Sequence, residues 1–440
     1  MHESIWAATK KLPHFPALGQ EISTDVLIIG GGMAGILTAY KLTRQGVNCV
    51  LIEGDRICRG VSGNTTAKVT VQHGLIYHRL LKQFGEERAK LYYHANRKAL
   101  EEYGKLADEI DCEFLRRNNY IYSSRSPAGL EREAAALQQL GIHSDYVNHI
   151  DLPISTFGAI RFRDQAQFHP LKLVSGIVGD LKIFEQTRAL EFLGDTVQTD
   201  RGKIRAGKIV VATHFPILNK HGSYFLKLYQ DRSYVLGLKI PVPLKGMYLD
   251  ESPEGLSFRQ YGDYWLLGGG NHRTGKKTTG WSTMEEFARK YVPQGRIQYR
   301  WAAQDCITLD GVPYIGRYSK RTPNLYVATG FNKWGMSSSM VAAQVLTDLI
   351  CKGASIYEPV FSPSRRMLRP QLVVNGLEST VNLLTPTVPR CPHLGCALKW
   401  NRHEHSWDCP CHGSRFDPEG NLLDGPATGP RKMSKENPGK

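Results

Sequence analysis

The sequence predicts an α/β protein with three parts. These are a Rossmann-type unit on a parallel sheet, an α+β unit of antiparallel sheet interleaved with it, and a small, shortened all-β domain at the C-terminus. Three observations predict this arrangement. The short apolar run at 25–29 leads directly into a glycine-rich turn and helical periodicity to about residue 45. The stretch from about 224 to 272 is rich in strand formers, and paired Cys/His hexapeptides stand at 391–396 and 409–414.

Composition limits the class of protein. The 440 residues carry a formal net charge of +15, and four of the nine cysteines lie between Cys391 and Cys411. The other five cysteines are scattered, which is not the pattern of a secreted disulfide framework. Residues 1–20 lack the apolar core of a signal peptide, and no run of about 18 apolar residues occurs. We therefore expect a cytoplasmic protein with no membrane span.

A basic balance is typical of proteins that bind nucleic acid, an anionic membrane or an acidic protein partner, and a generally basic surface with no dedicated partner fits equally well. An acidic electron-carrier protein would suit the positive charge. Outside the polar tail at 431–435 there is no dense Lys/Arg block. We expect no nucleic-acid partner.

The elements follow from periodicity and from turn residues. Pro13 and Pro16 predict an extended lead-in over 1–22, and Thr283 with Glu286 predicts a helix that starts with a capping box. Buried strands are expected at 25–29, 50–52, 208–212 and 324–328. Helices are expected at 86–111, 129–140, 170–181, 283–292 and 340–351.

These elements divide the chain into a large N-terminal unit, 1–355, and a C-terminal domain, 385–440. The Rossmann-type part is expected at about 22–75, 155–225 and 300–352, and the antiparallel part at about 76–154 and 226–299. The Pro/Ser-rich stretch at 357–364 lacks periodicity, so we expect a linker over 356–384.

The glycines after the first strand predict a dinucleotide site. Gly30, Gly32 and Gly35 fit the spacing G-x-G-x-x-G. In that motif the first glycine allows the tight turn, the second lets the backbone approach a pyrophosphate, and the third lets the helix pack on the strand. Glu53 closes the second strand, where a carboxylate can bind ribose hydroxyls.

Several segments resemble the D-amino-acid oxidase and glycine oxidase group of FAD-dependent oxidoreductases. They are the glycine fingerprint with 51–53, the Ser/Gly/Thr loop at 60–67, the strand end at 210–213, and the closing segments at 308–316 and 328–336. His214 departs from the family pattern by replacing a glycine. The resemblance implies FAD, and it places the following residues at the cofactor: Gly30, Gly32, Met33, Ala34, Gly35, Glu53, Ser62, Thr65, Thr66, Ala212, Gly330, Gly335 and Met336.

The two hexapeptides predict a metal centre. Cys391-Pro-His393 and Cys409-Pro-Cys411-His412 suit a 2Fe–2S cluster in which imidazoles replace thiolates on one iron. Zinc is the alternative that Cys and His ligands leave open. Two matched hexapeptides favour the cluster.

The pair also resembles the Rieske proteins of cytochrome bc complexes. The resemblance assigns Cys391 and Cys409 to one iron, and His393 and His412 to the other. It further implies a disulfide between Cys396 and Cys411. Phe416 stands where high-potential relatives carry tyrosine, which implies a potential in the lower or middle part of the Rieske range. Only about thirty residues separate the Pro/Ser-rich stretch from Cys391, too few for a full base sheet, so we expect the loops to lean on the flavin domain.

Three smaller signals remain. His73 and His78 have part of the iron-oxygenase spacing, but Thr70 replaces the required aspartate, so His73 is interpreted as structural. Cys306 is interpreted as a buried thiol. Candidate catalytic residues, weighed against solvated loop charges, are His272, Arg273 and Lys333.

The resulting hypothesis is a flavin-dependent, dehydrogenase-like oxidoreductase. It would oxidise a small substrate, such as an amine or amino acid, at FAD. It would pass electrons through the Rieske cluster to an external acceptor that docks near the exposed edge of His393 and His412. The alternatives are reverse electron flow with a reductase activity, and a redox-sensing or electron-transfer module without turnover.

Overall fold

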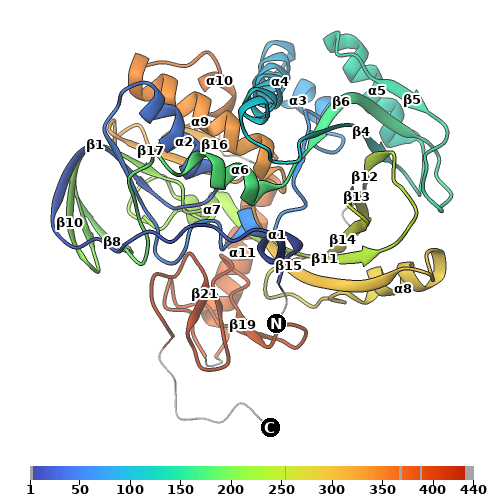
Figure 1. Ribbon diagram of the computed structural model, residues 1–440. Coiled ribbons are helices and arrows are strands. Elements are labelled where there is room, and N and C mark those ends of the chain that lie inside the picture. Colours follow the sequence, from blue (N-terminus) through green and yellow to red (C-terminus); the bar gives the residue numbers. More distant parts are fainter. Residues whose placement is uncertain (1–2, 253, 366–368, 387–388, 432–440) are drawn as a thin grey trace.

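The computed structural model describes residues 3–252, 254–365, 369–386 and 389–431. It has three sheets, and Figure 1 shows the parallel-sheet unit on the left, the second sheet on the right and the C-terminal domain below both. Among the described residues, every helix is too short or too polar to span a bilayer.

The first sheet is built around β1 (Ile22–Ile29), which pairs in parallel with β2 (Cys49–Ile52) and with β10 (Gly202–Val211). Apart from half-buried Ile22, the apolar residues of β1 and β2 are buried, as in a strand covered on both faces. The remaining strands are β7 (Ile183–Phe184), β8 (Ala189–Leu193), β9 (Thr196–Thr199), β16 (Tyr314–Arg317) and β17 (Leu325–Thr329).

Helices α2 (Met33–Arg44) and α9 (Gly335–Lys352) pack against each other beside this sheet. Both helices begin at strand ends, after β1 and after β17 respectively. Their N-termini therefore lie at the carboxyl edge of the parallel sheet, the edge where open α/β sheets bind ligands.

The second sheet runs in the order β15-β11-β14-β13-β12-β4-β6-β3, with β5 on β6. Its strands are β3 (Lys68–Val69), β4 (Leu115–Tyr122), β5 (Asp145–Val147), β6 (Ala159–Gln167), β11 (Leu228–Lys239), β12 (Gly246–Asp250), β13 (Ser257–Tyr261), β14 (Tyr264–Arg273) and β15 (Arg296–Thr308). All pairs are antiparallel except β4 with β12. The expected boundaries differ here, because β3, β6 and β15 join this sheet rather than the first.

The other long helices within residues 1–355 are α3 (Tyr77–Phe84), α4 (Glu86–Glu109), α5 (Ala128–Leu140), α6 (Pro170–Ile177) and α8 (Ser282–Tyr291). Four of them match predicted helices; α3 was not predicted, and α6 ends four residues before its predicted end. The predicted capping box is wrong, because Trp281 is the N-cap of α8 and no side chain caps the helix.

The N-terminal lead-in also differs from expectation. Residues Ile5–Thr9 form the short helix α1, capped by Ser4, and Trp6 is fully buried. Pro13 and Pro16 lie beyond this turn, so they do not prevent it.

The C-terminal domain is a four-stranded antiparallel sheet, in the order β18 (Lys399–Asn401), β19 (Ser406–Asp408), β20 (Arg415–Phe416) and β21 (Leu422–Asp424). The stretch expected as a linker holds α10 (Glu358–Phe361) and α11 (Pro370–Leu384). The Pro/Ser run misled the prediction, because α11 begins only after it, with Pro370 in the first turn of the helix where proline is tolerated.

Candidate functional site

A cavity of about 890 Å³ lies where the three parts of the molecule meet. The carboxyl ends of β1, β2, β10 and β17 line it on one side, and strands of the second sheet line another. The edge of the C-terminal domain, including Asp424 and Gly425, also contributes to the wall. The cavity therefore connects the glycine turn with the domain that carries the cluster motif.

The glycine turn leaves no room for side chains. Gly30 has φ of +114°, and a Cβ there would lie 2.5 Å from the Ala212 carbonyl oxygen. At Gly35 a Cβ would lie 2.0 Å from the Gly30 carbonyl oxygen. The backbone amide of Met33 donates to Ser62 Oγ at 2.8 Å, which holds the neighbouring loop over the start of α2. This geometry fits a pyrophosphate at a helix N-terminus.

Glu53 ends β2 beside this turn. Its Oε2 accepts a 2.7 Å hydrogen bond from the Gly31 amide, and its Oε1 accepts one of 2.9 Å from the Asp55 amide. Burial raises the pKa of Glu53, and these two backbone hydrogen bonds oppose that rise. The carboxylate is thus held in place at the cavity wall.

All but one of the thirteen residues predicted at the cofactor line the cavity. The exception is Gly35, which serves helix packing. Sequence reasoning missed the donors that fix the loop at 60–67. Trp6 Nε1 donates to the Thr65 carbonyl at 2.7 Å, and Arg259 donates to the Thr66 and Ala67 carbonyls at 2.6 and 2.7 Å. The residues of the chain fit a bound FAD.

Three cysteines of the cluster motif lie close together in the structure. The Sγ atoms of Cys396, Cys409 and Cys411 all lie within 4.8 Å of one another, and all three residues are buried. Every cysteine is a free thiol in the structure, so Cys396 and Cys411 are adjacent but not bonded. Their disulfide stays a prediction.

The two histidines of the motif face each other with ring centroids 4.9 Å apart. His393 Nε2 lies 3.1 Å from Oδ1 of Asn219, and His412 Nε2 lies 3.1 Å from the Phe225 carbonyl oxygen. Both Nδ1 atoms are buried and have no hydrogen-bond partner. Each imidazole is therefore oriented by its Nε2 and leaves Nδ1 to ligate, which fits two histidines on one iron of a 2Fe–2S cluster.

The expectation of an exposed histidine edge fails at His412, which is only 2% exposed, whereas His393 is partly exposed. Phe215 of the flavin unit packs edge-on against both rings, with centroids 6.4 Å from His393 and 6.0 Å from His412. His412 is covered because the small C-terminal sheet packs on the flavin unit instead of on a base sheet of its own. Phe215 follows His214, whose φ of +66° sharply turns the chain at the end of β10.

Side chains of the second sheet hold the cluster loops. Gln230 donates to the His412 carbonyl at 2.7 Å, and Gln304 donates to the Gly413 carbonyl at 2.8 Å. Arg273 donates to the Pro410 and Cys411 carbonyls at 3.0 and 3.3 Å. The cluster domain is thus fixed by donors from β11, β14 and β15.

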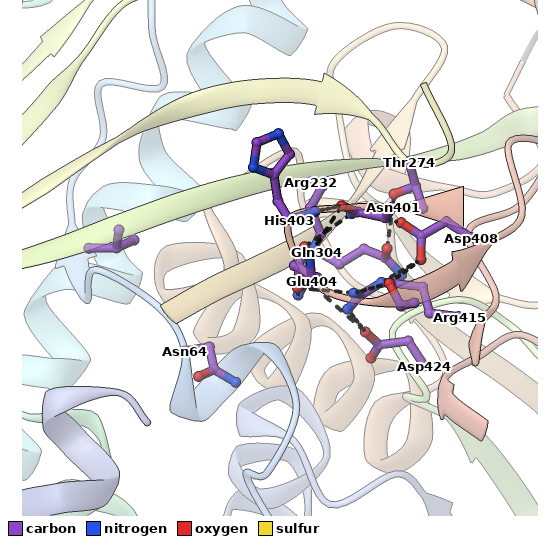
Figure 2. Close-up of polar contacts among 12 residues, drawn as sticks. Asn64, Arg232, Thr274, Gln304, Asn401, His403, Glu404, Asp408, Arg415 and Asp424 are labelled. Atoms are coloured by element: carbon purple, nitrogen blue, oxygen red, sulfur yellow. Dashed lines mark hydrogen bonds and ion pairs between the residues drawn. The ribbon is translucent and has the colours of Figure 1, made fainter. Parts of the chain in front are cut away.

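A buried charge network continues this contact (Figure 2). Arg232 of β11 forms a two-point ion pair with Glu404, which lies in the turn between β18 and β19. Arg415 reaches Glu404 and Asp408 at 3.0 Å each, and Asp424 at 3.4 Å. Burial raises the pKa of Glu404, but the charges of Arg232 and Arg415 outweigh it and hold the value down to about 2.

The three candidate catalytic residues lie in different surroundings, and only one of them lines the cavity. His272 stacks on Tyr234, with centroids 5.8 Å apart, and Arg273 binds the cluster loop, so neither lines the cavity. Lys333 does line it, and its Nζ lies 3.6 Å from Asp231 Oδ2. Only Lys333 remains placed for contact with a ligand there.

Sequence reasoning missed Asp305, which lines the cavity and stands opposite Asp231 in the β11–β15 pairing. Among the described residues its carboxylate has no hydrogen-bond partner. Burial raises the pKa of Asp305 to about 6; nearby Lys333 lowers it, and Asp231 raises it further. No strand is predicted from the sequence at 304–305, so nothing there indicates which way the Asp305 side chain points.

The two remaining signals behave as interpreted. His73 is buried, with Nδ1 2.6 Å from the Tyr92 hydroxyl and its ring stacked on Trp334. Cys306 is buried, with Sγ 3.6 Å from Thr329 Oγ1.

Comparison with known proteins gives two family matches. Residues 25–349 match the model described as FAD dependent oxidoreductase (DAO), and residues 372–435 match the Rieske [2Fe-2S] domain. The "Putative Rieske 2Fe-2S iron-sulfur protein YhfW" of Bacillus subtilis is 36% identical, over 98% of this chain and 97% of the relative. The gamma-glutamylputrescine oxidoreductase of Escherichia coli is 21% identical, over 78% and 87%.

Among solved structures, glycine oxidase from Geobacillus kaustophilus has a TM-score of 0.67 at 18% identity, covering 78% of this chain and 99% of that one. L-proline dehydrogenase from P. horikoshii has a TM-score of 0.66 at 17% identity, covering 80% and 98%. At these identities the likeness shows a shared fold.

Proposed function

Because the chain belongs to the FAD dependent oxidoreductase (DAO) family and ends in a Rieske [2Fe-2S] domain, we propose that it oxidises a small amine or amino acid and passes the electrons through its cluster to an external acceptor. FAD takes up two electrons as a hydride equivalent, and the cluster carries one at a time. The cytoplasmic location predicted from the sequence belongs to this proposal.

The observation that carries the proposal is the packing of both cluster histidines against the flavin unit, which buries His412. Phe215 touches both imidazoles and lines the same cavity as the glycine turn. A cluster that served a separate partner through these histidines would present them to solvent. Here the chain buries His412 and partly covers His393 with its own cofactor-binding unit, which supports internal transfer.

The cavity also supports a substrate with an amino group. Asp305 is placed to accept a hydrogen bond from an amine, and Asp231 adds negative charge beside it. Lys333 offers a positive group to a substrate carboxylate. The printed names of glycine oxidase and L-proline dehydrogenase refer to amino-acid substrates, in keeping with such a cavity.

The direct experiment is an anaerobic screen in which the holoenzyme is mixed with amines, amino acids and hydroxy acids. Bleaching of the flavin absorbance is the readout. We expect bleaching by an amine or an amino acid. We also expect the Asp305→Asn variant to respond more weakly, while Asp195→Asn, an exposed control of the same chemistry, stays unchanged. Bleaching by hydroxy acids alone would contradict the substrate class.

Turnover with an artificial acceptor completes the test. Steady consumption of the bleaching substrate is expected from an enzyme. A single reduction without turnover would favour a redox sensor.

A further inference from the structure

Helix α11 is oriented against the usual rule, with polar side chains toward the protein and apolar ones toward solvent. The polar set recurs at spacings of four, three and four residues: Gln371, Asn375, Glu378 and Asn382. The apolar set recurs at four, four and three residues: Val373, Leu377, Val381 and Leu384. Such spacings put each set on one face of a helix.

The polar face is anchored by specific contacts. Asn375 Nδ2 donates to the Leu226 carbonyl at 3.1 Å, and its Oδ1 accepts from Arg273 at 3.0 Å. Glu378 pairs with Lys276 at 2.6 Å. Because these contacts come from the flavin unit, the rotation of α11 about its axis is fixed.

The apolar face is open. Leu377 and Val381 are each 62% exposed, and Leu384 is 77% exposed. Contiguous exposed aliphatic side chains on a packed helix mark an interaction surface.

This surface continues to the cluster. Leu383 Cδ2 lies 3.8 Å from the position a Cβ on Gly395 would take. The Arg390 guanidinium donates to the carbonyls of Leu383 and Gly395 at 2.9 and 3.0 Å. Leu394, next to the ligand His393, is itself 40% exposed. The open side of the first cluster loop therefore adjoins the aliphatic stripe.

We propose that this stripe docks on an anionic membrane surface, with α11 lying in the plane of the interface and its polar face on the protein. The stripe is made of valine and leucine, without the tryptophan, tyrosine or arginine that dominate protein–protein hot spots. The chain carries a net charge of +15, which attracts anionic lipid and opposes pairing of two copies. Docking there would bring the open side of the cluster to a membrane-bound acceptor.

The test is flotation of the full-length holoenzyme with vesicles of phosphatidylcholine, with and without phosphatidylglycerol. We expect the protein to float with the anionic vesicles and to remain below with the neutral ones. The double variant L377E/V381E should lose most of this flotation. The variant L190E/L193E adds the same charge at leucines that are 51% and 50% exposed on β8, and should float like the wild type.

Three outcomes would overturn the inference. They are no flotation of the wild type at low salt, equal loss in both double variants, and wild-type dimers that L377E/V381E turns into monomers. Cluster absorbance reports that each variant is folded. Flavin bleaching and cluster reduction in solution do not depend on this surface, so failure here is distinguishable from failure of the proposed function.

Discussion

The two faces of the strand pair β11–β15 do different work. Gln230, Arg232 and Gln304 point to the cluster domain and are committed to its loops and to Glu404. Asp231 and Asp305, one residue away along the strands, point to the other side. Asp305 lines the cavity, as Gln230 and Gln304 also do, but among the described residues its carboxylate has no hydrogen-bond partner. Because side chains alternate along a strand, one pair of strands can fix a redox partner and still leave carboxylates for a ligand.

The largest expected effect is the loss of stability when Glu404, which pairs with Arg232 and Arg415, is replaced. Glu404→Ala removes the buried carboxylate that pairs with Arg232 and Arg415. Removing one member of such a network lowers the free energy of unfolding by about 3–5 kcal/mol. We expect to measure this loss by unfolding the holoenzyme with denaturant and monitoring the absorbance of the cluster. Glu419→Ala, at an exposed position, is the control; an equal loss there would contradict a special role for the network.

The ion pairs of Glu404 also predict that acid destabilises the folded protein. The pKa of Glu404 is held down to about 2 in the folded protein, below its unfolded value. Its stabilisation is therefore fully present above the unfolded pKa and is lost as pH falls toward about 2. Unfolding curves measured at decreasing pH should show this loss in the wild type, and a shallower loss in Glu404→Gln.

For Asp305, which lines the cavity, we expect a change in reaction rate rather than a loss of stability. Asp305→Asn should lower kcat/KM for an amine substrate by about 100-fold, the scale of a positioned proton-accepting group. The pKa of Asp305 is raised to about 6, so wild-type kcat/KM should rise with pH through that value as the carboxylate forms. A pH profile that keeps this rise in the variant would assign it to another group.

A smaller effect is expected at the glutamines. Gln304→Ala leaves the buried Gly413 carbonyl without its donor, a loss of about 1–3 kcal/mol. The cluster should bleach at lower denaturant concentration than in Gln139→Ala, which changes an exposed glutamine on α5. Unchanged cluster stability would mean that the loops do not depend on the second sheet.

The smallest change is the one predicted at Phe416, which is fully buried in β20. Phe416→Tyr adds a hydroxyl that can hydrogen-bond near the cluster, and hydrogen bonds there raise the potential. A redox titration should show an upward shift. No shift, or a fall, would contradict this explanation of the predicted lower potential.

The sequence predicted what depends on local chemistry. The steric demands at Gly30 and Gly35, and the ligand spacing around Cys391 and Cys409, are visible in the chain itself. The contacts to Arg259, Asp305 and Gln304 depend on strand register and on which domain covers which face. His272 and Arg273 lie outside the cavity for that reason, because the cluster domain packs on their side of β14. Helix α11 was missed because the linker predicted from the Pro/Ser-rich stretch was extended over 356–384.

The central claim is internal transfer from the flavin site to the cluster past Phe215. The most direct measurement is rapid mixing of oxidised holoenzyme with a reducing substrate under anaerobic conditions, followed by flavin absorbance and by EPR of the reduced cluster. We predict that the EPR signal follows flavin bleaching at a rate that does not change when the enzyme concentration is raised. Bleached flavin with a cluster that stays oxidised, or a rate that scales with enzyme concentration, would contradict the claim.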